Sequence, residues 1–142
     1  MLTLVETSNG LALSYPLWLG VLSIAGLALL AYAARPKAVV TRRWAILVVG
    51  GMLVWAGIYF ATFKVTLTPE SGRVYGFLNY DARLDWKDAA SATVVQKPGK
   101  GGPNYFIVVT GKSGGEFELP LKGLNDAERQ RVIAYVYARM PR

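Results

Sequence analysis

The sequence predicts a hairpin of two membrane-spanning helices followed by a small α+β domain. Two apolar runs, residues 16–34 and 44–63, each have about the length that a helix needs to cross the hydrocarbon core of a bilayer. A short basic loop, residues 35–43, joins them. From residue 64 to residue 142, short β-rich runs alternate with turn residues, and an apolar-striped helix closes the chain.

The two apolar runs contain no Asp, Glu, Lys or Arg. Helices buried in soluble proteins seldom stay apolar on every face over this length, so the runs favour membrane spans over a pair of core helices. Trp18 and Trp44 lie near the ends of the runs, where indole rings favour the membrane interface. Transporters and proton relays carry charges at membrane depth, so the runs are interpreted as an anchor.

A cleaved signal peptide is the alternative interpretation of the first run, because residues 31–33 (AYA) resemble a signal-peptidase site. Against it, residues 1–15 contain Glu6 and no Lys or Arg, whereas a signal peptide begins with a basic region. The apolar run is also longer than that of a signal peptide. We therefore expect an uncleaved hairpin, preceded by an N-terminal arm at residues 1–15.

Small residues in the second run allow another helix to approach closely. Gly57 and Ala61 form a small-xxx-small pair, and Gly50 and Gly51 offer a second point of close approach. We expect these residues to pack the two spans against each other, with dimerisation of the protein as the alternative.

The basic loop predicts the orientation of the hairpin. Short loops rich in Lys and Arg remain on the cytoplasmic side of the membrane. Here the determinants are Arg35, Lys37, Arg42 and Arg43, and residues 1–15 contain no base. We expect a multi-pass protein of the inner membrane, with the loop in the cytoplasm and the C-terminal domain on the periplasmic or outer side.

Composition excludes several kinds of catalytic and metal site within this chain. It contains neither histidine nor cysteine, so zinc sites, Ser-His-Asp triads and Cys-His pairs cannot form from its own residues. Its 16 Lys and Arg exceed its 9 Asp and Glu, but they form no stripe of the kind that binds nucleic acid. We expect no enzyme activity, no cofactor, no metal and no nucleic-acid partner.

The domain after residue 64 is predicted to contain five to seven short strands and then one helix. The predicted strands are residues 65–68, 73–78, 82–86, 92–96, 105–110 and 116–119. Asn125 and Glu128 have the spacing of a capping box, which starts the helix at residues 126–140. An apolar stripe marks its buried face: Val132, Ile133, Val136, Tyr137 and Met140. Arg129, Gln130 and Arg131 are expected on its solvent side.

This order of elements resembles the bacterial pleckstrin-homology-like domain. The likeness is carried by residues 65–68 directly after a helix pair, by LDWKDA at 84–89, which stands in the place of the family's I-x-W-x-D-I step, by YFIVVT at 105–110, by FELPL at 117–121, and by the closing helix. The resemblance implies an antiparallel β-sandwich or barrel capped by a C-terminal helix, with a role in binding or scaffolding. Ala89 departs from the family, which usually has a larger aliphatic residue there.

Two charged patterns suggest sites that their contexts do not support. Residues 110–113 (TGKS) match the end of a phosphate-binding loop, but Phe106 replaces the required glycine and a predicted strand follows, so the pattern indicates a hairpin turn. Asp81, Asp85 and Asp88 lack the spacing of a calcium loop and are interpreted as exposed acids. Trp86 between them is predicted to be a core anchor.

Lys97, Lys100 and Lys112 occupy two glycine-rich loops that could lie near one another. Together they could contact anionic lipid headgroups or an acidic partner, with solvated loop lysines as the alternative interpretation. The function predicted first is that of a membrane-anchored, non-catalytic interaction or scaffold protein. Such a protein could serve as an accessory subunit or assembly factor of a larger membrane complex. A lipid-sensing module that uses these three lysines is the alternative.

Overall fold

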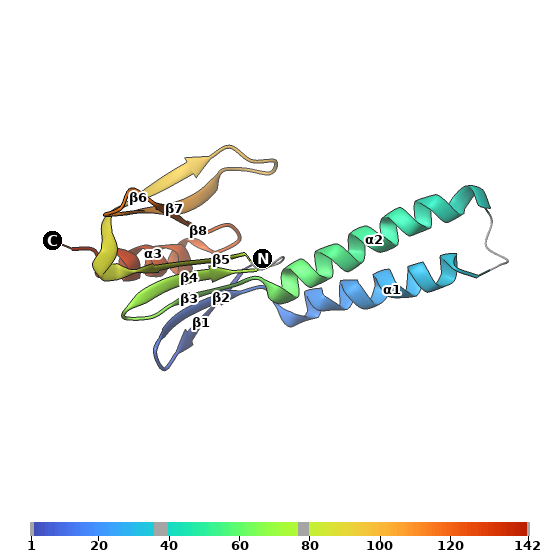
Figure 1. The fold of residues 1–142 in the computed structure, drawn as a ribbon, viewed down its shortest axis with the longest axis horizontal. Coiled ribbons are helices and arrows are strands. Elements are labelled where there is room, and N and C mark those ends of the chain that lie inside the picture. The colour runs from blue at the N-terminus through green and yellow to red at the C-terminus, as the bar shows by residue number, and fades with distance from the viewer. Residues whose placement is uncertain (1, 36–39, 77–79, 142) are drawn as a thin grey trace. The chain divides into compact units, whose positions relative to one another are not determined.

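The structure, a computed structural model, describes residues 2–35, 40–76 and 80–141. The chain divides into two compact units: Met1–Ser14 together with Lys64–Arg142 form the first, and Tyr15–Phe63 form the second. Figure 1 shows the strands of the first unit and the helix pair of the second. Lys37 and the predicted end of a strand at residue 78 lie outside the described residues.

Eight strands form two antiparallel sheets in the part of the first unit that the structure describes. The five-stranded sheet has the order β1-β2-β3-β4-β5, with β1 (Thr3–Thr7), β2 (Gly10–Ser14), β3 (Lys64–Leu67), β4 (Ser71–Tyr75) and β5 (Asp81–Asp85). The three-stranded sheet has the order β6-β7-β8, with β6 (Ala89–Lys97), β7 (Asn104–Gly111) and β8 (Glu116–Pro120). The unit therefore has the small α+β fold that the sequence predicts, completed by helix α3 (Asp126–Tyr137).

The segment expected to be an N-terminal arm instead forms the β1–β2 hairpin of the larger sheet. Thr7 pairs with Gly10 across a two-residue turn made of Ser8 and Asn9, and these turn-forming residues followed by a glycine are a hairpin signal that was not used in predicting this segment. Strand β2 then pairs with β3, with Ser14 opposite Lys64. The helical unit is thus an insertion between two neighbouring strands, and its two ends leave the sheet from paired positions.

Trp86 is a core anchor, as predicted. It lies in the short 3-10 helix η3 (Trp86–Asp88), which leads from the larger sheet to the smaller one, and only 4% of its surface is exposed. Its indole Nε1 donates a hydrogen bond of 2.8 Å to the carbonyl oxygen of Thr68. A Cβ added at Gly72 would lie 2.9 Å from Cη2 of Trp86 and 3.3 Å from Cε1 of Phe117. Gly72 therefore leaves room for the indole beside a residue of the other sheet.

Helix α3 begins with the predicted capping box. The Glu128 amide donates to Oδ1 of Asn125 at 2.8 Å, and the Asn125 amide donates to a Glu128 carboxylate oxygen at 3.1 Å. Val132 and Val136 are fully buried, as the apolar stripe predicts. Tyr137, by contrast, is exposed, and the helix ends at this residue, three residues before the predicted boundary. Arg129 is not on the solvent side: its guanidinium stacks 4.3 Å from the centre of the Tyr105 ring.

The second unit consists of the 3-10 helix η1 (Leu17–Gly20), α1 (Val21–Ala33) and α2 (Val40–Thr62). These elements overlap the two predicted apolar runs, but α2 begins at Val40, inside the predicted loop 35–43, so its first turn includes Arg42 and Arg43. Residues Arg42–Thr62 are long and apolar enough to cross a membrane, whereas Leu17–Ala33 is a shorter apolar helix. Core helices of soluble proteins and signal sequences can have the same length and composition.

Glycines hold α1 and α2 close together. A Cβ added at Gly26 would lie 2.6 Å from the carbonyl oxygen of Gly50, and one added at Gly57 would lie 2.5 Å from the backbone nitrogen of Ser23. A Cβ at Gly51 would meet nothing within 4 Å. Gly50 and Gly57 therefore pack the two helices against each other, as expected, whereas Gly51 lies outside that contact.

Candidate functional site

The structure does not bring the three predicted lysines together. Lys97 ends β6 and Lys100 lies in the exposed β6–β7 loop, whereas Lys112 lies in the β7–β8 turn. Strand β7 separates these two loops. Its eight residues span about 23 Å at the usual rise per residue. The strands do pair in sequence order, but successive hairpin loops of such a sheet fall at opposite ends, which the sequence analysis overlooked.

Two of these lysines are already engaged within the domain. Nζ of Lys97 forms a salt bridge of 2.9 Å with Glu118 and lies 5.0 Å from the centre of the Phe106 ring. Nζ of Lys112 donates a hydrogen bond of 2.7 Å to the carbonyl oxygen of Lys87. The three lysines therefore do not form one cationic surface, and the structure gives no support to a lipid site built from them.

The three predicted exposed acids do not form one site. Asp81 binds Arg73 through two hydrogen bonds, at 2.8 Å from Nε and 2.6 Å from Nη2. Asp85 forms a salt bridge of 3.1 Å with Arg83 on its own strand. Among the described residues, no group of three or more acidic side chains is arranged to hold a metal ion.

We expect the Asp81–Arg73 pair to make the stability of the domain depend on acid pH. The hydrogen bond from Arg73 lowers the pKa of the Asp81 carboxyl below its ordinary value of 3.8. The pair's contribution is therefore complete above about pH 3.8 and is lost as the pH falls through the lower folded-state pKa. Asp81→Asn should flatten this part of a urea-midpoint profile, measured from pH 6 to about pH 2.5.

Asp88→Asn is the matched control for this profile, because the Asp88 side chain forms no ion pair within the described residues. A profile that Asp81→Asn and Asp88→Asn change equally would contradict a special role for the Asp81–Arg73 pair.

Three of the four predicted topology determinants lie at one end of the helix pair. Arg35 follows α1, and its backbone amide donates to the carbonyl oxygen of Tyr32 at 3.1 Å. Arg42 and Arg43 lie in the first turn of α2 and are exposed. The fourth, Lys37, is outside the described residues. Their cationic groups therefore flank the connection between the two apolar helices.

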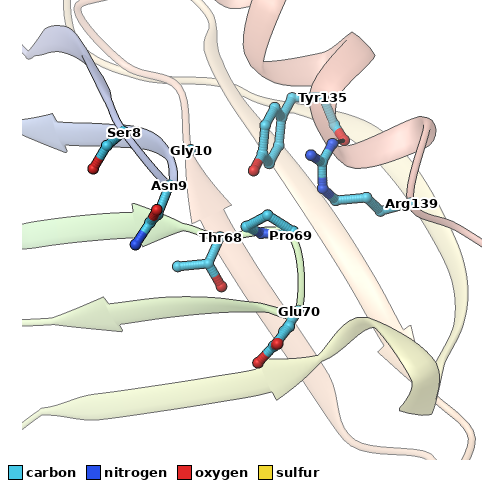
Figure 2. A pocket seen from close by; sticks show the side chains of 8 residues that line it. All are labelled: Ser8, Asn9, Gly10, Thr68, Pro69, Glu70, Tyr135 and Arg139. Atoms are coloured by element: carbon cyan, nitrogen blue, oxygen red, sulfur yellow. Dashed lines mark hydrogen bonds between the residues drawn. The ribbon is translucent and has the colours of Figure 1, made fainter.

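A cleft in the β-rich unit combines polar groups from three distant parts of the chain (Figure 2). We call it the α3 cleft. Its volume is about 580 Å³, and residues 8–10 of the β1–β2 turn, residues 68–70 of the β3–β4 turn, and Tyr135 and Arg139 line it. Figure 2 shows the Tyr135 hydroxyl directed toward the two turns, with Arg139 beside its ring.

Gly10 allows the β1–β2 turn to reach this position. Its φ of 145° is one that side-chain-bearing residues rarely adopt. A Cβ there would collide with the carbonyl oxygen of Leu67 and would lie 2.8 Å from the Tyr135 hydroxyl. The absence of a side chain at Gly10 therefore brings two strands and the tyrosine of α3 together.

Two polar atoms of the α3 cleft have unmet hydrogen-bonding capacity. The Tyr135 hydroxyl and the Arg139 Nε are buried, and neither has a hydrogen-bond partner within the described residues. The Arg139 guanidinium lies 3.3 Å from the centre of the Tyr135 ring, and its Nη1 donates to the Tyr135 carbonyl oxygen at 2.9 Å. This stack holds the guanidinium in place and leaves Nε as an unused donor.

The α3 cleft was not predicted from the sequence. Tyr135 and Arg139 are four residues apart, and this spacing places both on one face of a helix. This spacing indicates a site only when the residues that face Tyr135 and Arg139 from the other side of the cleft are known. The Ser8–Asn9 side of the cleft depends on the β1–β2 hairpin, which was interpreted as an arm.

Two further hollows follow the α3 cleft, and each shares lining residues with the one before it. The next one, of about 340 Å³, shares Pro69 and Glu70 with it, and a third, of about 530 Å³, shares Arg83 and Asp85 with the second. The third reaches Lys112 in the β7–β8 turn. Three neighbouring hollows thus run from the end of α3 across the turns of the domain.

Comparison of the chain with protein-family models and with curated proteins finds no significant match in either set.

Proposed function

We propose that this chain is a membrane-anchored, non-catalytic interaction protein, in which the helix pair is the anchor and the β-rich unit binds a partner. The observation that carries the proposal is the exposure of the apolar helices. Within the second unit, only 11% of the apolar window of α2 is buried. A helix of this composition in the core of a soluble protein would be mostly buried. Lipid is the solvent that suits such a surface.

Side chains around the helix pair support the same conclusion. Large apolar groups are exposed on both helices, among them Leu17 at 89%, Ile24 at 67% and Met52 at 69%. An exposed apolar surface that continues along two helices is unusual in a protein that remains in water. Leu17–Ala33 falls short of the usual spanning length, so we propose that neighbouring apolar residues or local thinning of the bilayer complete its crossing.

The insertion of the helices between paired strands restricts the topology that we propose. Residues 3–14 and the domain after residue 64 belong to one sheet, so they must lie on the same side of any membrane that the helices cross. Two crossings meet this requirement. The short loop with its Arg and Lys residues then lies on the opposite side, which we assign to the cytoplasm.

We also propose that the β-rich unit is related to the bacterial pleckstrin-homology-like domains. The succession of two antiparallel sheets and a C-terminal helix is compatible with that resemblance, but other small α+β domains share it. This relationship favours binding over catalysis.

Cysteine labelling tests the anchor and its orientation together, because the natural chain has no cysteine. We expect Lys100→Cys, in an exposed loop of the domain, to react with a membrane-impermeant maleimide in bacterial spheroplasts. Ala34→Cys, at the loop end of α1, should react only after the membrane is permeabilised. The reverse pattern would contradict the orientation, and release of the protein by alkaline carbonate would contradict the anchor itself.

A further inference from the structure

We propose that the α3 cleft binds a carboxylate carried by an extended segment of a partner protein. This proposal rests on the interaction role proposed above and identifies the surface and the chemistry involved. The cleft offers two kinds of group that a carboxylate binds well, a guanidinium and a tyrosine hydroxyl. Both Arg139 Nε and the Tyr135 hydroxyl lack a hydrogen-bond partner in the described part of the chain.

An acceptor on the ligand would satisfy these donors. A buried donor without a hydrogen-bond partner is unfavourable, so two such donors in one cleft indicate where an acceptor on a ligand would add binding free energy. The Tyr135 ring already orders the Arg139 guanidinium by stacking, which limits the entropy lost when a ligand binds. Nε is a donor and cannot accept, so a ligand oxygen is the complementary group.

The charge balance of the cleft favours a carboxylate over a phosphate. Arg139 contributes one positive charge, and Glu70 on the opposite turn contributes one negative charge. A phosphate ester that carries nearly two charges would be repelled by Glu70 without a second cation to balance it. A carboxylate carries one charge, and Glu70 remains available to accept hydrogen bonds from amides of the same ligand.

The row of hollows favours a polypeptide over a small molecule. Beyond Glu70 the second and third hollows continue past Arg83 and Asp85 to Lys112. An extended chain fits an elongated surface with alternating charges, whereas a small carboxylate would use the α3 cleft alone. The β1–β2 and β3–β4 turns lie at one end of β2 and β3, and Ser14 and Lys64, next to the helical segment, lie at the other end of these strands.

The test uses the full chain in detergent micelles and follows the side-chain Nε–H signal of Arg139 by NMR. The probe is an acetylated, amidated pentapeptide with a central glutamate between glycines. We expect the glutamate pentapeptide to shift this signal saturably. Its counterpart with a central glutamine should bind at least roughly tenfold more weakly, because the charge-assisted hydrogen bond is lost. Inorganic phosphate and acetate are the other two ligands.

Variants locate the binding. Tyr135→Phe keeps the ring and removes the hydroxyl, so we expect it to weaken binding of the glutamate pentapeptide several-fold while Arg139 remains ordered. Arg139→Gln, followed through backbone amides of residues 8–10, should abolish it. Arg131→Gln is the matched control, since Arg131 is an exposed arginine of α3 that lies outside the cleft and pairs with Glu6.

Each outcome decides a part of the proposal. Absence of a saturable shift, or equal binding by Arg139→Gln, would overturn the site. Phosphate binding as tight as that of the pentapeptide would overturn the carboxylate, and acetate binding as tight would overturn the extended segment. These measurements are made in micelles and do not depend on how the helices cross a bilayer. Failure of the cysteine labelling experiment would therefore leave the cleft result standing, and the reverse also holds.

Discussion

Trp86→Ala is expected to lower the free energy of unfolding of the β-rich unit by about 3–5 kcal/mol, the range found when a large buried aromatic is truncated. Trp86 is 4% exposed and packs against Gly72, beside which Phe117 of the other sheet also lies. Its removal leaves a cavity between two sheets. It also leaves the Thr68 carbonyl oxygen without the indole hydrogen bond. Small domains are stable by about 5–15 kcal/mol, so this loss is a large share of the total.

Pulse proteolysis in urea measures this effect on the full chain in detergent, because cleavage reports the unfolded fraction of the β-rich unit. Trp86→Phe should be milder, since it keeps a ring and loses the hydrogen bond. Trp44→Ala is the matched control, because Trp44 is 74% exposed and belongs to the other unit. Equal midpoints for Trp86→Ala and Trp44→Ala would show that Trp86 does not anchor this core.

Local patterns predicted most of the elements after residue 64. The predicted strands at 105–110 and 116–119 overlap β7 and β8, because continuous apolar runs and alternation between polar and apolar residues reflect burial directly. The capping box of α3 likewise depends on residues three positions apart. These patterns depend only on residues close together in the sequence, and the elements that they predict are present in the structure.

Long-range pairing was harder to predict. Strands β2 and β3 are neighbours in the sheet, although about fifty residues separate them in the sequence, and no local pattern indicates that pairing. The α3 cleft depends on it, since residues 8–10 reach Tyr135 only when β2 lies beside β3. The expectation that Lys97, Lys100 and Lys112 could lie near one another failed for a similar reason. It depended on which end of the three-stranded sheet each loop occupies, and local sequence does not show this.

A disulfide is expected to form readily between Gly20→Cys and Ala61→Cys in the same chain. A Cβ at Gly20 would lie 3.9 Å from the Ala61 Cβ, within the range of about 3.5–4.5 Å that disulfides require. The natural chain contributes no competing thiol. The rate of oxidation, followed by loss of maleimide reactivity, therefore reports how often the two helices are packed together.

Gly26→Leu in this double-cysteine background should slow the oxidation roughly tenfold or more, since overpacking by about 1–3 kcal/mol reduces the packed fraction by that order. The added Cβ would meet the Gly50 carbonyl oxygen and the Val54 nitrogen at 2.6 and 2.7 Å. Both atoms are backbone, so the helices themselves must separate. Gly51→Leu is the matched control: a Cβ there meets nothing within 4 Å, and the rate should not change.

A non-reducing gel of the same oxidation reaction distinguishes packing within one chain from dimerisation. A cross-link within the chain keeps the monomer mass, whereas a cross-link between two chains doubles it. If Gly51→Leu rather than Gly26→Leu slowed the reaction, or if the product were mainly a dimer, the glycines would serve contact between chains. The anchor would then itself be an interaction surface. A monomeric product that is sensitive to Gly26→Leu instead means that the helices are occupied with each other, which leaves recognition of the partner to the β-rich unit.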